Sequence, residues 1–233
     1  MDATLIDQHH AETRERFDAW AESATFQRLR PWLVYLQTQV LAQIDWARTR
    51  QVLDVACGSG WAVLEAARRM VHHKAGRAFG CDISAGMLQQ RDVPAELAEK
   101  VTFQEANAQE LPFEDRQFDA VFCTAAFHHF PKPVRALREF RRVLRPGGVA
   151  LVADPRRDGS LGVWLWDRLH RWFEKSHVMY YRRDEFRRMF QEAGYADVHV
   201  RSLDPGYAET KKLVRGAALT WGKVPADSQD TPC

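Results

Sequence analysis

The segment VLDVACGSG, residues 52–60, restricts the fold of this chain more than any other part of the sequence. An apolar run that carries Asp54 leads into a glycine turn at 58–60, and a pattern of helical periodicity follows directly. Glycines let the backbone approach a ligand closely, and the N-terminus of the following helix offers free N–H groups to a polar or anionic group. The segment therefore predicts a strand, a ligand-binding turn and a helix in succession, as in nucleotide-binding α/β folds.

Short apolar runs and helical patterns alternate along the rest of the chain. This alternation predicts an α/β fold of the Rossmann-like, doubly wound type, with a mostly parallel seven-stranded sheet between helices. Five strands are expected at 51–57, 77–82, 101–106, 118–124 and 148–154, and two closing strands within 196–219, around a turn at 204–206. Helices are expected at 61–72, 133–144 and 184–194, and the second of these ends at the terminator RPGG, residues 145–148.

Two helices are expected ahead of the first strand. Trp32, Leu36 and Val40 share one helical face, and Pro31 suits the first position of that helix, where its missing N–H costs nothing. We expect a single domain over residues 1–222, with N-terminal lid helices in 1–48, a helical insertion at 156–183 and a flexible tail at 223–233.

The composition is that of a soluble globular protein. Apolar residues make up 45% of the chain, and a net charge of +2 is too small to indicate a nucleic-acid partner. The polar N-terminal stretch lacks the apolar core of a signal peptide, and no run approaches the ~18 apolar residues of a spanning helix. Cys57, Cys81 and Cys123 lie in apolar runs without zinc-site spacing. This pattern favours reduced thiols, no metal site and a cytoplasmic location.

The residues around the glycine turn narrow the choice of ligand. Asp82 ends the next expected strand, at the distance from Gly60 where nucleotide-binding sheets place a carboxylate on ribose hydroxyls. A dinucleotide motif needs a third glycine where Val63 stands, and the P-loop pattern is absent. Asp54 would repel a pyrophosphate but can hold an ammonium group. The turn therefore suits a ligand with one ribose and an amino acid end, and argues against a nicotinamide dehydrogenase.

Four ordered motifs carry a family resemblance. VLDVACGSG is followed by GCDISAGML at 80–88, by EANAQELPFEDRQFDAVFC at 105–123 and by FHHFPKPVRALREFRRVLRPGG at 127–148. In this order they resemble the class I S-adenosylmethionine-dependent methyltransferases, specifically the type 11 group that includes the ubiquinone and menaquinone C-methyltransferases. RFDAWAES, residues 16–23, resembles that family's N-terminal lid over the cofactor.

The resemblance implies S-adenosyl-L-methionine as cofactor and assigns residues to each part of it. The implied cofactor-binding residues are Asp54, Ala56, Gly58, Ser59 and Gly60 at the methionine end, Asp82 at the ribose, Ile83, Met87, Asn107 and Ala108 at the adenine, Thr124 at the end of the fourth strand, and Phe17 and Trp20 in the lid. Plain helix packing is the alternative for Phe17 and Trp20.

One position departs from the family pattern. Asn107 stands where the family usually has an acid that contacts the adenine amino group. An amide can still bridge adenine through its donor and its acceptor, and Gln109 is a substitute contact for the same group.

Candidate acceptor-side residues follow the fourth and fifth strands, at the edge where open α/β sheets bind ligands. His128 and His129 are the candidate catalytic residues, as a general base or as substrate contacts, and helix capping or packing is the alternative. Asp154 is a substrate contact or a helix cap, and Tyr180 or Tyr181 is expected to face the acceptor.

The insertion after the fifth strand is rich in tryptophan. Trp164 and its apolar neighbours have helical spacing, which is consistent with a cap over an aromatic or lipid-like acceptor or with an ordinary core helix. Arginines around the apolar stripe allow a third interpretation, contact with a membrane surface.

The predicted function is S-adenosylmethionine-dependent methylation of a small aromatic or apolar acceptor, by a monomer or homodimer. No nucleic-acid partner is expected, because the arginines of 135–145 fit a solvated helix face and CTAAFHHF lacks the D-P-P-Y type of segment. The alternative is a non-catalytic S-adenosylmethionine-binding protein, such as a regulatory or partner subunit.

Overall fold

The computed structural model describes residues 3–21, 23–158, 168–169, 178–203 and 216–226. Its centre is a seven-stranded sheet in the order β3-β2-β1-β4-β5-β7-β6. The strands are β1 (Gln51–Val55), β2 (Arg77–Asp82), β3 (Val101–Glu105), β4 (Phe118–Thr124), β5 (Leu144–Pro155), β6 (Ala196–Leu203) and β7 (Ala217–Lys223). The first five strands are mutually parallel, and β7 runs antiparallel to both of its neighbours. This is the doubly wound sheet that the sequence predicts.

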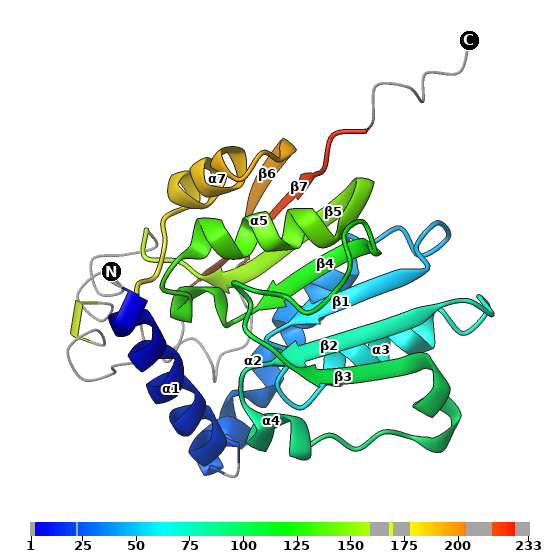
Figure 1. Cartoon of the computed structure of the whole chain (residues 1–233), viewed down its shortest axis with the longest axis horizontal. Helices are drawn as coiled ribbons and strands as arrows, with labels where there is room; N and C mark the ends of the chain where they lie inside the picture. The colour runs from blue at the N-terminus through cyan, green and yellow to red at the C-terminus, as the bar shows by residue number, and fades with distance from the viewer. Residues whose placement is uncertain (1–2, 22, 159–167, 170–177, 204–215, 227–233) are drawn as a thin grey trace.

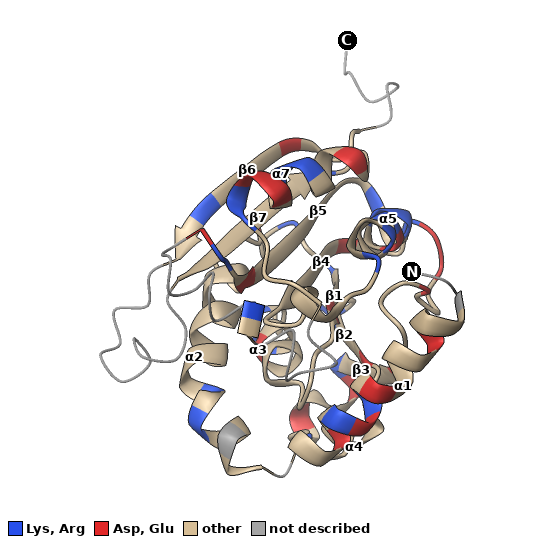
Figure 2. Ribbon diagram, turned by 90° about the vertical axis from the view of Figure 1, so that its left-hand side faces the viewer, with Lys and Arg blue, Asp and Glu red and all other residues tan. Residues whose placement is uncertain are grey.

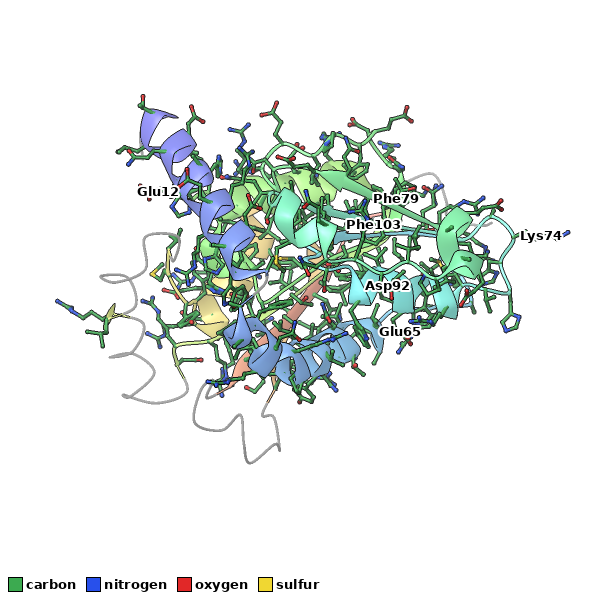
Figure 3. The ribbon with its side chains drawn as sticks, turned by 90° about the horizontal axis from the view of Figure 1, so that it is seen from below. Glu12, Glu65, Lys74, Phe79, Asp92 and Phe103 are labelled. Carbon is green, nitrogen blue, oxygen red and sulfur yellow. The ribbon has the colours of Figure 1, made fainter. Side chains whose placement is uncertain are left out.

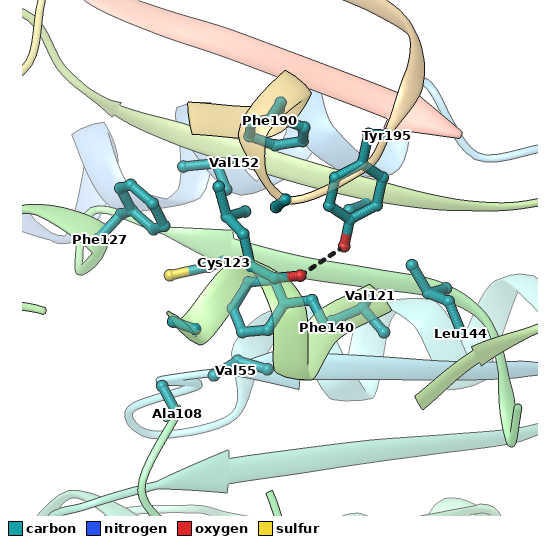
Figure 4. Packing of buried hydrophobic residues seen from close by; sticks show 14 of the residues in the cluster. Val55, Ala108, Val121, Cys123, Phe127, Phe140, Leu144, Val152, Phe190 and Tyr195 are labelled. Atoms are coloured by element: carbon teal, nitrogen blue, oxygen red, sulfur yellow. Dashed lines mark hydrogen bonds between the residues drawn. The ribbon is translucent and has the colours of Figure 1, made fainter. Parts of the chain in front are cut away.

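Helices cover both faces of the sheet. In Figure 1, α5 (Pro133–Val143) and α7 (Arg183–Glu192) lie in front of it, and α2 (Ala24–Leu41) and α3 (Trp61–Arg69) lie behind. Each face has its own buried apolar cluster. In the front cluster, drawn in Figure 4, the Tyr195 hydroxyl donates a 2.9 Å hydrogen bond to the Leu137 carbonyl and so fixes α5 to the turn before β6.

Helix α1 (Ala3–Trp20) lies at the end of the sheet toward which the parallel strands point (Figure 1). Figure 2 looks onto this edge, with α1 on one side and α2 on the other. Seen from below, α1 lies toward one end of the molecule, and Lys74, in the loop before β2, lies at the opposite end (Figure 3). The carboxyl ends of the parallel strands therefore face α1.

The predicted helices and strands agree with the observed ones to within three residues, with three exceptions. Helix α2 begins at Ala24, with Pro31 inside it, so the prediction that Pro31 starts the helix was wrong. The reason is that Ser23 accepts a 3.2 Å hydrogen bond from the Phe26 N–H, and this cap starts the helix two turns earlier.

The other two differences concern β5 and β7. Strand β5 begins at Leu144 rather than 148, because Leu144 already pairs with Phe118 of β4. The register between the two strands then shifts across Gly147 and Gly148, and Val149 pairs with Ala120. Strand β7 continues to Lys223, past the predicted end at 219, and Val224 donates a hydrogen bond from its N–H to the Gly148 carbonyl. The tail expected from residue 223 thus begins in ordered structure, and residues 227–233 lie outside the described part of the chain.

No helix in the described part of the chain is both long and apolar enough to span a membrane. The predicted insertion at 156–183 lies largely outside the described residues, and so does Trp164.

Candidate cofactor and acceptor site

A cavity lies at the carboxyl ends of β1, β2 and β4, between α1 and α2. The cavity and the open solvent at its mouth together occupy about 1050 Å³. Its wall has three parts: a glycine-loop region (Ala56, Gly58, Ser59, Asp82, Ile83 and Met87), a His10 cluster (His10, Thr13, Asn107 and Gln109) and an aromatic region (Phe17, Trp20, Phe26, His129 and Phe130). Ala108 and Thr124 also line it.

The backbone conformation of the loop after β1 depends on its two glycines. Gly58 and Gly60 have φ angles of 55° and 79°, in the left-handed region where side chains are disfavoured. A Cβ atom on Gly60 would lie 2.5 Å from the ring of Phe103, on β3 (Figure 3). Gly60 is also the N-cap of α3, so the loop lies close against β3 while the first N–H groups of α3 stay near the cavity.

Asp82, at the end of β2, supports this loop. Its carboxylate accepts 2.8 Å and 2.9 Å hydrogen bonds from the N–H groups of Gly58 and Ser84. Burial raises the pKa of Asp82 to about 6, although the two backbone hydrogen bonds act in the opposite direction. Asp82 therefore lies on the cavity wall with its orientation fixed by two neighbouring loops.

Asp54, in β1, lies one strand away and is not a cavity-lining residue. Its side chain is fully buried, and neither carboxyl oxygen has a hydrogen-bond partner among the described residues. Burial, together with the nearby charge of Asp82, raises the pKa of Asp54 well above its usual value. An unpaired buried carboxyl group behind a glycine loop is costly unless a bound polar or cationic group compensates it.

In the His10 cluster, α1 meets the loop after β3. Asn107 Oδ1 accepts a 2.9 Å hydrogen bond from the Gln109 N–H, and Asn107 Nδ2 lies 3.3 Å from His10 Nδ1. Gln109 Nε2 lies 2.6 Å from His10 Nε2. Burial, with a smaller effect of His9, lowers the pKa of His10.

Further contacts fix α1 over the cavity. Asp18 accepts hydrogen bonds from the Ser84 hydroxyl (2.5 Å) and the Gly86 N–H (2.8 Å), at the start of α4 (Ala85–Gln89). Arg14 Nε donates a 3.1 Å hydrogen bond to the Ile83 carbonyl. These contacts join α1 to the segment that follows Asp82, so the helix covers the cavity as the predicted lid would.

The two candidate catalytic histidines occupy different places in the short helix η2 (Phe127–His129). His129 lines the cavity, and its ring packs edge-on against Phe17 at 5.1 Å. His128 lies behind it, with Nδ1 3.0 Å from both carboxylate oxygens of Asp154. The two imidazole rings are 4.0 Å apart, so the Asp154–His128 pair supports His129 from behind.

Several predicted site residues do not line the cavity. Tyr181 is buried in the core against Phe127, and Tyr180 packs against the ring of His128 at 4.9 Å. Asp154 contacts His128, Gly60 is the N-cap of α3, and Trp164 lies outside the described residues. The roles of these residues therefore remain predictions.

Three groups of cavity residues are not among those predicted from the sequence. His10 and Thr13 lie on the same face of α1 as Phe17 and Trp20, and this helical spacing was the available signal. One face of α2 contributes residues spaced three and four apart, Arg30, Leu33, Val34 and Gln37. Phe26 and Phe130 complete the aromatic region.

The residues present fit the cofactor that the motifs predict. The unpaired carboxyl of Asp54 suits the ammonium group of the methionine end, and Asp82 suits the ribose hydroxyls. One end of the Gln109 side-chain amide and Thr13 Oγ1 are buried without partners among the described residues, and they suit the heteroatoms of a base.

Comparison with known proteins agrees with this geometry. Residues 53–152 match the model of a methyltransferase domain family. The demethylmenaquinone methyltransferase of Lactiplantibacillus plantarum is 32% identical over 192 residues, which cover 73% of this chain and 80% of that protein. A Haloferax volcanii protein, solved in a complex with the methyltransferase activator Trm112, superposes with a TM-score of 0.69 at 24% identity, over 90% of this chain and 97% of that one.

A second solved structure was determined with a product of methyl transfer bound. Phosphoethanolamine N-methyltransferase 2 of Haemonchus contortus, in complex with S-adenosylhomocysteine, superposes with a TM-score of 0.63 at 17% identity, over 81% of this chain and 52% of that one. At such identities the two structures establish the fold alone. The matches of motif order, sequence and fold together show that this chain is an S-adenosylmethionine-dependent enzyme and belongs to the class I methyltransferases of the type 11 group.

Proposed function

We propose that this methyltransferase acts on a flat aromatic acceptor of the quinol or phenol class, bound in the aromatic region of the cavity. The observation that carries the proposal is the set of rings there. Phe17 packs edge-on against Trp20 at 5.6 Å, and Trp20 against Phe26 at 5.2 Å. Aromatic walls favour a planar apolar acceptor, and a demethylmenaquinone methyltransferase among the relatives supports a quinone-type compound.

The glycine-loop region holds the cofactor in this proposal. S-adenosylmethionine, when bound, supplies an electrophilic methyl group on a sulfonium. Asp82 holds the ribose hydroxyls, and the backbone of Gly58 and Ser59 contacts the methionine end. Asp54, buried behind this loop, offsets the positive charge of the ammonium group without touching it. Ile83, Met87 and Ala108 enclose the base. Because displacement at a sulfonium needs chiefly alignment, these residues act by positioning the methyl group and excluding water.

The aromatic region has two tasks. The faces of Phe17 and Trp20 stabilise a cation nearby, and they keep the reacting groups dry. His129 takes the proton of the acceptor hydroxyl as the acceptor oxygen bonds to the methyl group and the sulfur–methyl bond breaks, which leaves the thioether S-adenosylhomocysteine. Where the ring carbon conjugated to that oxygen is the nucleophile, the proton on that carbon is lost afterwards and the aromatic ring is restored. The Asp154–His128 pair is a positioning pair, since it fixes the short helix that carries His129.

The experiment is a methyl-transfer assay with purified protein, S-adenosylmethionine and three acceptor classes. The first is a naphthoquinol without the ring methyl group, and the second is a simple phenol. The third class is amines, represented by one simple amine and by phosphoethanolamine, which is charged. We expect S-adenosylhomocysteine and a methylated product to form with the naphthoquinol. Turnover with the amines alone would refute the acceptor class. Cofactor binding without turnover of any acceptor would favour the non-catalytic alternative.

A further inference from the structure

We infer that Arg30 of α2 selects acceptors in which a side chain of the aromatic ring carries a carboxylate. The inference rests on the proposed function, because it narrows the class of acceptor that the aromatic region takes. Arg30 is a specificity-determining residue in this inference: its guanidinium binds the carboxylate while the ring lies against the aromatic wall.

Arg30 is the only Lys or Arg in the part of the cavity wall that the described residues form. It lines the cavity and is also exposed, so it lies at the mouth. Asp82 is the only carboxylate of the same wall, and it accepts hydrogen bonds from two backbone N–H groups. An anionic group that enters the cavity from the mouth therefore meets a cation there.

The guanidinium of Arg30 has neither a hydrogen bond nor an ion pair with any described residue. Helix α2 carries two arginines and no Asp or Glu (Figure 2), so no acid lies three or four positions away to pair with it. Arg142 of α5, by contrast, binds the carboxylates of Glu139 and Asp115. Because a guanidinium is a planar fork of donors that matches a carboxylate, Arg30 is suited to bind one supplied by a ligand.

The neighbours of Arg30 on the helix place it on the acceptor side of the cavity. Phe26, Arg30 and Leu33 are spaced four and three residues apart, so they share one face of α2. Phe26 packs against Trp20 at 5.2 Å, and Leu33 packs against the apolar cluster that contains Phe26. Arg30 thus lies between two residues that pack against the aromatic region, within reach of a substituent on a ring bound there.

The cofactor also carries a carboxylate, at its methionine end, and the glycine loop offers that group a different partner. Helix α3 begins at Trp61, directly after the loop of Gly58 and Ser59, and all three residues line the cavity. The first N–H groups of a helix have no partner within it and carry partial positive charge, so they suit a carboxylate. We therefore assign Arg30, on another element, to the acceptor.

The same helix provides a matched control. Arg28 is exposed like Arg30, but it is not among the residues that line the cavity. Two positions along a helix correspond to a rotation of about 200°, so the two arginines point to nearly opposite sides of α2. A substitution of Arg28 changes the net charge of the helix without changing the cavity wall.

The experiment compares two acceptors that differ in charge. One is a naphthoquinol without the ring methyl group that carries a propanoate side chain, and the other is the corresponding propanamide. The saturated spacer leaves the reactivity of the ring the same in both. The wild type should show a kcat/KM about 5- to 20-fold higher for the propanoate at low salt. This preference should fall as the ionic strength is raised to about 0.5 M, because salt screens a charge pair at the mouth.

Three variants complete the experiment. Arg30→Met should remove the preference for the propanoate, and Arg30→Glu should reverse it, because two like charges then meet at the mouth. Arg28→Met should keep the wild-type preference. Calorimetry should show S-adenosylhomocysteine bound by Arg30→Met as tightly as by Arg28→Met.

The preference is a ratio measured within one variant, so a loss of folded protein does not alter it. Equal kcat/KM of the wild type for the two acceptors, or the same preference in Arg30→Met as in Arg28→Met, would overturn the inference and leave the proposed function intact. Weaker S-adenosylhomocysteine binding in Arg30→Met, with an unchanged acceptor preference, would overturn it as well and assign Arg30 to the cofactor. Failure of the wild type to methylate these two acceptors and the unsubstituted naphthoquinol would overturn the proposed function too.

Discussion

In the glycine-loop region the backbone itself positions the functional groups, whereas in the aromatic region helices far apart in the sequence do so through ring contacts. Asp82 is fixed by two backbone N–H groups from loops on adjacent strands. His129 is fixed by Phe17 of α1 on one side and by His128 on the other. The cofactor half of the site is therefore built into the sheet, while the acceptor half depends on how α1 and α2 pack over it.

The largest effect is expected from a substitution of Asp82 in the glycine-loop region. Asp82→Ala removes the acceptor of the ribose hydroxyls and of the Gly58 N–H. Loss of two hydrogen bonds to a charged group corresponds to about 3 kcal/mol or more, so calorimetry should show S-adenosylhomocysteine binding weakened at least about 100-fold. Asp92→Ala, at an exposed site nearby, is the matched control. Unchanged affinity in Asp82→Ala would refute the ribose assignment.

The same contrast explains how much of the site could be predicted from sequence. Asp82, Gly58 and Gly60 lie at fixed spacings after strands, and the sheet register brings those strand ends together, so a linear motif suffices. Pairing within the His10 cluster joins residues 97 and 99 positions apart, and no local pattern encodes that contact. The start of α2 was mispredicted for a related reason, because the Ser23 cap outweighs the preference of Pro31 for a helix start.

The next prediction separates the two histidines of the acceptor half. His129→Ala should lower kcat about 100-fold with little change in cofactor affinity, since a general base contributes about that much. His128→Ala and Asp154→Asn should lower kcat less, and addition of imidazole should partly restore turnover only in His129→Ala, where the cavity itself is enlarged. Equal losses in all three variants, without rescue, would assign both histidines a structural role.

A smaller effect tests whether the glycine loop depends on β3. Gly60→Ala adds a methyl group at a φ of 79° and against the Phe103 ring, so it should destabilise the fold by about 2–3 kcal/mol. Gly147→Ala is the control, because Gly147 has a φ of 77° with nothing within 4 Å of the added carbon. It should cost about 1 kcal/mol. Denaturant unfolding measures both, and equal costs would refute the contact with Phe103 as the cause.

The smallest effect is the pH dependence of cofactor binding, which we assign to Asp82 in the cofactor half of the site. The pKa of Asp82 is raised to about 6, above its unfolded value, so protonation favours the folded protein. The contribution of Asp82 to the stability of the ligand-free fold therefore increases as the pH falls from 7 toward 4. Cofactor binding should change in the opposite sense, because only the ionised carboxylate accepts hydrogen bonds from both ribose hydroxyls.

Titrations of S-adenosylhomocysteine should thus show about tenfold weaker binding at pH 5 than at pH 7. Asp82→Asn should bind weakly and remove most of this pH dependence, whereas Asp54→Asn should retain it. A constant wild-type affinity over the whole range would mean that the ribose does not depend on the charge of Asp82. The cofactor half would then rely, like the acceptor half, on shape and not on a fixed carboxylate.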